Sequence, residues 1–143
     1  DTGFDWSLLT IEETEQTMLG EPNGQIFRSL KELRARGAQI ALDDFGTGYG
    51  GLRHLANWPI DTLKIDKFFI DGLAGSERDT AVLEAVMHMC QRLGLNVIAE
   101  GIETPQQIAA LREYGCLLAQ GFAFDRPLAG EELHNFRRRY DLP

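Results

Sequence analysis

The chain contains five short apolar runs, and each run ends on a charged or amide side chain. The runs lie at residues 9–12, 40–44, 62–66, 97–100 and 116–120. Runs of this length between polar segments are typical of buried parallel strands. Active sites of barrels and open α/β sheets gather where parallel strands end, so we expect these polar groups to converge on one edge of a sheet.

Segments with helical periodicity separate the runs. Helices are predicted at 25–36, 78–93 and 131–139, from Thr104 onward, and as a shorter turn at 51–58. Five successive strand–helix units predict an α/β fold with parallel neighbouring strands. Because a complete eight-stranded barrel needs roughly 250 residues, the chain forms either a small open α/β domain or part of a barrel.

Composition narrows the class of protein. One domain with a substantial core is expected from 143 residues with 43% hydrophobic content. A formal net charge of −8 argues against binding of duplex nucleic acid, which requires a basic surface. The sequence shows neither a membrane-length apolar stretch nor the basic start of a secretion signal, so we expect no membrane contact from this segment. Cys90 and Cys116 lack metal or redox spacing and are predicted to be buried residues in a reducing compartment.

A glycine-rich segment follows the second run. Residues 46–51 match G-x-G-x-x-G, and Asp66 lies about 20 residues further on, as in dinucleotide-binding folds. Asp43 and Asp44 oppose this interpretation, because two carboxylates at a strand end repel a bare pyrophosphate. Divalent cations between them would turn the repulsion into binding. A dinucleotide-dependent oxidoreductase is therefore the weakest of the functional hypotheses.

Further polar groups lie at or inside the predicted strands. Glu12 and Glu100 each follow apolar residues, and Lys64 lies within an apolar run. A lysine there needs carboxylates or a bound anion, unless its strand is an edge strand that exposes it to water. Adjacent aspartates are often solvated or cap helices, but the apolar residues 40–42 fix this pair at a strand tip. Carboxylates and a lysine at one edge suit divalent-metal and phosphate chemistry.

Five ordered motifs in the chain resemble those of the EAL-domain family. The motifs are IEETE at 11–15, DDFGTGY at 43–49, KID at 64–66, AEGIET at 99–104 and QGF at 120–122. Members of this family are bacterial phosphodiesterases that hydrolyse cyclic di-GMP to linear pGpG on a TIM-like barrel with Mg²⁺ or Mn²⁺. The resemblance therefore implies a partial TIM-like (β/α) barrel and this substrate.

The resemblance also implies a two-metal site. Glu12 and Asp43 correspond to metal ligands, and Asp44 helps to bind a second Mg²⁺ or Mn²⁺ ion. Lys64 would hold the hydrolytic water, and Glu100 would act as the base or as a water-coordinating carboxylate.

Three more residues correspond to supporting positions of the family. Glu103 and Gln120 would support the site or bind the guanine end of the substrate. Glu15 would steady the loop after the paired aspartates, here residues 45–50. That loop organises metal binding and a dimer face in the family, so a homodimer through it is expected.

The chain also departs from the family pattern. It contains neither the Glu-Ala-Leu motif with its nearby arginine nor the metal-binding asparagine of the next strand. We therefore expect residues 1–143 to be the C-terminal part of an EAL-type phosphodiesterase domain from a cytoplasmic bacterial protein, inactive in isolation. The alternative is a non-catalytic cyclic di-GMP receptor or protein-interaction module with a degenerate EAL domain. A receptor has no need for Lys64 and Glu100 together, which favours catalysis.

Overall fold

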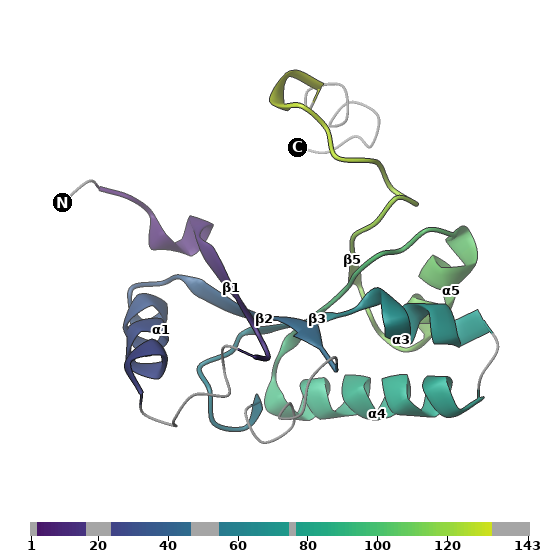
Figure 1. The fold of residues 1–143 in the computed structure, drawn as a ribbon, viewed down its shortest axis with the longest axis horizontal. Coiled ribbons are helices and arrows are strands. Elements are labelled where there is room, and N and C mark those ends of the chain that lie inside the picture. The colour runs from purple at the N-terminus through teal and green to yellow at the C-terminus, as the bar shows by residue number, and fades with distance from the viewer. Residues whose placement is uncertain (1–2, 17–23, 47–54, 75–76, 133–143) are drawn as a thin grey trace.

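Five parallel strands form a single sheet in which strand order follows sequence order (Figure 1). The computed structural model describes residues 3–16, 24–46, 55–74 and 77–132. The strands are β1 (Thr10–Thr14), β2 (Gln39–Phe45), β3 (Thr62–Ile65), β4 (Asn96–Ala99) and β5 (Leu118–Ala119). Every neighbouring pair is parallel, which confirms the predicted α/β fold of consecutive strand–helix units.

Helices connect the strands close to the predicted positions. They are α1 (Gln25–Ala35), α3 (Lys67–Asp71), α4 (Glu77–Leu93) and α5 (Pro105–Glu113), with short 3₁₀ turns at Trp6–Leu8, Gly72–Ala74 and Gly130–Glu132. The start of α5 agrees with the prediction, because Thr104 caps the helix in a reciprocal capping box with Gln107. The short helix α3 was not predicted. Half of the predicted turn at 51–58 and most of the predicted helix at 131–139 lie outside the described residues.

The two faces of the sheet carry different side chains, because side chains alternate in direction along each strand. One face is apolar and packs in the core with α1 and α4, which lie on the same side of the sheet in Figure 1. Its fully buried members are Ile40, Leu42, Leu63, Ile65 and Ala99. Burial of each large aliphatic side chain stabilises the fold by about 1.5–3 kcal/mol. The opposite face carries Glu12, Asp43 and Lys64.

An irregularity in β2 changes the direction in which the side chains of its last residues point. Leu42 pairs with Leu63 and Phe45 pairs with Ile65, so β2 contains one more residue than β3 over this stretch. Asp44 lies within the bulge and has a φ of 54°. Aspartate tolerates this left-handed conformation better than most residues. The bulge lets two adjacent aspartates present their carboxylates to the same edge, which regular alternation would prevent.

The loops after β4 and β5 are fastened to each other. The Ile102 amide donates to the Gln120 carbonyl (3.1 Å), and the Ala123 amide donates to the Ile102 carbonyl (2.8 Å). Glycine is required at 121, because a Cβ there would collide with the Ile102 backbone. The segments that carry Glu100 and Gln120 are therefore held in fixed positions.

Both cysteines are buried free thiols, as predicted. Burial raises the pKa of Cys90 to about 11, with a smaller contribution from Cys116. Within the described ranges, no helix is long and apolar enough to span a membrane.

Candidate active site

Lys64 lies at the centre of a carboxylate cluster. Its Nζ atom is 2.8 Å from Glu100 Oε1, 3.0 Å from Glu12 Oε2 and 3.1 Å from Asp43 Oδ1. Burial alone would lower the pKa of Lys64, but these hydrogen bonds outweigh burial and raise the pKa above its ordinary value. Lys64 is therefore an ammonium ion at neutral pH, and it donates hydrogen bonds without being able to accept a proton.

The strand that carries Lys64 is central to the sheet. β3 pairs with β2 on one side and with β4 on the other, and Lys64 is only 6% exposed. The alternative of a solvated lysine on an edge strand is wrong. The carboxylates that a buried lysine requires come from β1, from β2 and from the residue after β4.

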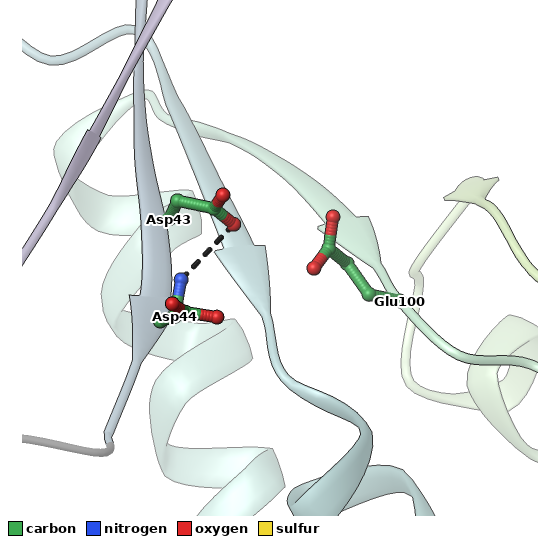
Figure 2. Close-up of side chains that lie close together, drawn as sticks. All are labelled: Asp43, Asp44 and Glu100. Atoms are coloured by element: carbon green, nitrogen blue, oxygen red, sulfur yellow. Dashed lines mark hydrogen bonds between the residues drawn. The ribbon is translucent and has the colours of Figure 1, made fainter.

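Asp44 adds a further carboxylate to this edge. Asp43, Asp44 and Glu100 each offer an oxygen within 4.8 Å of the others, and Figure 2 shows their side chains converging between β2 and the end of β4. The Asp44 amide donates to Asp43 Oδ1 (3.0 Å) across the bulge. Four carboxylates, with Glu12, thus face one ammonium group.

This arrangement fits a divalent cation. Four carboxylates and one ammonium group leave a formal charge of −3, and such an excess is costly at close range unless cations compensate it. Carboxylate oxygens are the hard ligands that Mg²⁺ and Mn²⁺ prefer. Among the described residues, Asp43, Asp44 and Glu100 bring carboxylate oxygens close enough together to surround such an ion, and Glu12 lies beside them at Lys64.

Gln120 supports the cluster from the end of β5. Its Nε2 atom donates to Glu100 Oε1 at 2.6 Å, and its backbone amide donates to the Ala99 carbonyl at 2.8 Å. Lys64 contacts the same Oε1 atom of Glu100. Two donors therefore orient the Glu100 carboxylate through one oxygen, and neither of them uses Oε2.

Glu103 and Glu15 do not belong to the contacts around Lys64. Glu103 forms an ion pair with Lys67 on α3 (3.0 Å). Glu15 follows β1 and is buried at 2% exposure. The loop that Glu15 is predicted to steady extends beyond the described residues, so its role stays a prediction.

Sequence reasoning missed a clamp that holds the loop after β4. Gln107 Oε1 accepts from the amides of Glu103 (2.8 Å) and Thr104 (3.0 Å), and its Nε2 donates to Asp71 on α3 (3.3 Å). The pattern T-x-x-Q at 104–107 is the capping-box signal that could have identified Gln107. Asp66 is also reassigned, because its side chain accepts from the Phe68 amide and caps α3.

The site does not coincide with a large cavity. A cavity of about 600 Å³ lies between α4, β4 and the start of β5, and its lining includes Met87, His88 and Tyr114. None of the predicted site residues lines it. The candidate site is defined by its charged groups at the carboxyl-terminal edge of the sheet.

Comparison with known proteins decides the family. The EAL domain family model matches residues 2–127. The chain belongs to the EAL domain family. This membership confirms the relation to TIM-like barrels.

The relatives of this EAL chain include enzymes and solved domains. Cyclic di-GMP phosphodiesterase NbdA of Pseudomonas aeruginosa is 44% identical over 132 residues, which are 92% of this chain and 17% of NbdA. The crystal structure of the EAL domain of Mycobacterium smegmatis DcpA superposes with a TM-score of 0.84 at 35% identity, covering 94% of this chain and 60% of the DcpA chain. A manganese and cyclic di-GMP complex of Klebsiella pneumoniae BlrP1 superposes with a TM-score of 0.80 at 36% identity. The match covers 87% of this chain and 32% of the BlrP1 chain. The chain thus spans about one-sixth of the curated relative.

Proposed function

We propose that this EAL chain belongs to a metal-dependent phosphodiesterase that hydrolyses cyclic di-GMP to linear pGpG. The observation that carries the proposal is the contact of Lys64 Nζ with three carboxylates beside a fourth, at the end of parallel strands. A single carboxylate would neutralise a buried lysine. The further carboxylates of this cluster give it an excess of negative charge that can bind cations. The NbdA and BlrP1 relatives support cyclic di-GMP as the substrate.

The side chains divide the chemistry between them. Glu12, Asp43 and Asp44 would hold Mg²⁺ or Mn²⁺, which when bound supplies positive charge that stabilises the phosphoryl group during displacement. Lys64 donates hydrogen bonds that orient the attacking water or the phosphoryl oxygens. Glu100 Oε2 accepts a proton from the attacking water while the water oxygen bonds to phosphorus and the bond from phosphorus to the 3′ oxygen breaks. The leaving 3′ oxygen takes a proton from solvent, and Glu100 returns its proton to solvent, which gives a 5′ phosphate and a 3′ hydroxyl.

The supporting residues act on the geometry of this centre. Gln120 keeps the Glu100 carboxylate oriented through Oε1. Glu103 supports the loop after β4 through Lys67, and Glu15 is proposed to steady the loop after Asp44. The homodimer through that loop and the cytoplasmic location stay predictions.

The test is hydrolysis of cyclic di-GMP by the full-length protein, followed by chromatography of pGpG. We expect turnover with Mn²⁺ or Mg²⁺, loss of turnover in EDTA and recovery when Mn²⁺ is returned. Binding of cyclic di-GMP without hydrolysis in any of these ions would contradict catalysis and support the receptor alternative.

We further propose that residues 1–143 are the C-terminal part of an EAL domain. The share of the DcpA EAL domain chain that they cover, 60%, supports this proposal, as does the absence of a Glu-Ala-Leu sequence from the chain. The isolated chain is expected to show negligible turnover beside the full-length protein under the same Mn²⁺ conditions. Equal activity of the two proteins would show that the site is complete within these residues.

A further inference from the structure

The short helix α3 lies directly after the strand that carries Lys64. Two residues separate Lys64 from the start of α3 at Lys67. Asp66 caps the helix by accepting from the Phe68 amide at 2.8 Å, and Ile70 of the helix is fully buried in the core. Because this connection is short and capped, the position of α3 constrains the position of the Lys64 ammonium group.

Polar contacts join α3 to the loop that follows β4. Lys67 Nζ lies 3.0 Å from Glu103 Oε1 and 3.2 Å from Asp71 Oδ1. Gln107 Nε2 donates to the same Asp71 oxygen at 3.3 Å. Gln107 Oε1 accepts from the Glu103 amide at 2.8 Å. The side chain of Gln107 therefore connects the backbone of this loop to α3.

The backbone of two loops is packed closely against α3. A Cβ added at Gly101, where φ is 66°, would lie 2.7 Å from the Cβ of Lys67. A Cβ added at Gly46, directly after β2, would collide with the ring of Phe69. The helix thus contacts both the segment after the paired aspartates and the segment after Glu100, so it can hold the two loops in place relative to Lys64.

Gln107 uses its two amide atoms for different partners. Its oxygen takes part in the capping box with Thr104 at the start of α5. Either glutamine or glutamate can supply that oxygen at the third helical position. Its nitrogen donates to Asp71, a contact that glutamate could not make. The contact with α3 can therefore be removed while the cap of α5 is kept.

We propose that Gln107 and Asp71 are positioning residues that hold the loop after β4 against α3, and so keep Glu100 in contact with Lys64. The inference rests on the proposed function and adds to it a pair of residues outside the carboxylate cluster. Glu100 Oε1 lies 2.8 Å from Lys64 Nζ, and these two groups come from the two segments that the pair joins. Misplacement of a reacting group by about 1 Å can reduce a rate about 100-fold.

The test exchanges the two groups of this contact in the full-length protein. Gln107→Glu keeps the capping oxygen, removes the donor and sets a second carboxylate against Asp71. Because the Lys67–Glu103 ion pair remains, we expect kcat for cyclic di-GMP at saturating Mn²⁺ to fall about 10-fold, with KM changed less than about 2-fold. The Kd for Mn²⁺, measured by calorimetry without substrate, should rise about 10-fold.

A double variant separates positioning from a general loss of structure. Gln107→Glu combined with Asp71→Asn restores a hydrogen bond whose direction is reversed, because the new amide donates to the new carboxylate. Both kcat and the Kd for Mn²⁺ should return to within about 3-fold of the unsubstituted protein. Gln106→Glu, which adds the same charge at the exposed neighbouring position on α5, is the matched control and should change neither quantity. Thermal melting verifies that each variant is folded.

The outcomes separate this clamp from the proposed function. A loss of kcat or of Mn²⁺ affinity in Gln107→Glu that the double variant reverses supports the clamp. Unchanged values of both quantities in Gln107→Glu, or a loss that the double variant does not reverse, overturns it while hydrolysis by the unsubstituted protein still stands. A reversible loss of Mn²⁺ affinity without hydrolysis by any variant supports the clamp and contradicts the phosphodiesterase. An unsubstituted protein that neither binds Mn²⁺ nor hydrolyses cyclic di-GMP contradicts both.

Discussion

Buried or half-buried charges lie at both ends of the strands, at the amino-terminal edge and at the carboxyl-terminal edge of the sheet. The two edges differ in how far these charges are neutralised by neighbouring groups. At the amino-terminal edge, Asp61 pairs with Arg34 at 2.8 Å, and its second oxygen accepts from the Ile40 amide at 3.0 Å. One anion meets one cation and one backbone donor. At the carboxyl-terminal edge, one ammonium group meets an excess of carboxylates.

This difference in neutralisation separates charges that only stabilise the fold from charges that can bind a ligand. The Arg34–Asp61 pair is complete within the protein, so it can fasten α1 to the start of β3 without any ligand. Among the residues that the structure describes, the carboxylates of Glu12, Asp43, Asp44 and Glu100 outnumber the single ammonium group of Lys64, so the cluster gains stability from an added cation. Such incomplete compensation is costly in a fold and is typical of functional sites.

Substitution of Glu100 should give the largest effect. Glu100→Gln removes the proposed proton acceptor but keeps the size of the side chain and its contact with Gln120. We expect kcat for cyclic di-GMP in the full-length protein to fall about 10²- to 10⁴-fold, measured in Mn²⁺ at saturating substrate. Glu113→Gln, at the end of α5, is the control and should keep full activity. A loss below about 10-fold in Glu100→Gln would remove Glu100 from the chemistry.

Replacement of Lys64 by methionine should have the next largest effect. The variant loses the donor at the centre of the cluster, and kcat should fall about 10²- to 10³-fold. Lys64→Arg should not restore activity, because a planar guanidinium does not fit the buried slot of an ammonium group. Mn²⁺ should still raise the melting temperature of Lys64→Met, since the carboxylates remain. Lys31→Met, on α1, provides the matched control.

Substitutions in the Arg34–Asp61 pair at the amino-terminal edge should lower stability without changing activity. Asp61→Ala leaves the Ile40 amide without its side-chain acceptor and should lower the free energy of unfolding by about 1–3 kcal/mol. Arg34→Ala, at an exposed position, should cost only about 0.2–1 kcal/mol. Urea unfolding measures the free energy lost in each variant. The kcat of each variant should equal that of the unsubstituted protein. A large loss of kcat in either variant would abolish the distinction between the two edges.

The effect expected to be smallest at neutral pH concerns the buried thiols of Cys90 and Cys116, whose charge changes only in alkaline solution. Burial raises the pKa of Cys90 to about 11, so the unfolded chain releases this proton at lower pH than the folded chain. Stability should therefore fall as pH rises from about 8.5, the pKa of a free thiol, toward 11, by at most about 1.4 kcal/mol per pH unit. Cys90→Ala should show a shallower decline in urea unfolding at the same pH values. Identical declines in the two proteins would contradict this assignment.

Much of the fold could be predicted from the sequence because its signals are local. Apolar runs and helical periodicity located all five strands and three of the helices. Pro105 after Thr104 marked the start of α5, since capping depends on residues only three apart. The short helix α3 escaped prediction, because five residues carry too little periodicity to recognise.

The candidate site was predictable in part. Its acidic residues and Lys64 were recognised because each follows or interrupts an apolar run. The contact of Gln120 with Glu100, and the pairing of Glu103 with Lys67 instead of with the cluster, were not predictable. Those contacts join residues that the sequence does not place in contact, and they depend on how the loops after β4 and β5 pack.

The sequence by itself determined where the strands and long helices lie, which residues are charged and in what order parallel strands follow one another, because these depend on the chemistry of neighbouring residues. Only the tertiary structure decided that Asp43 and Asp44 face the same edge. Side chains on a regular strand alternate, and the pairing of β2 with β3 produces the bulge that overrides this alternation. The charge excess around Lys64 likewise exists only where four strands meet, since each strand alone carries too few charges to create it.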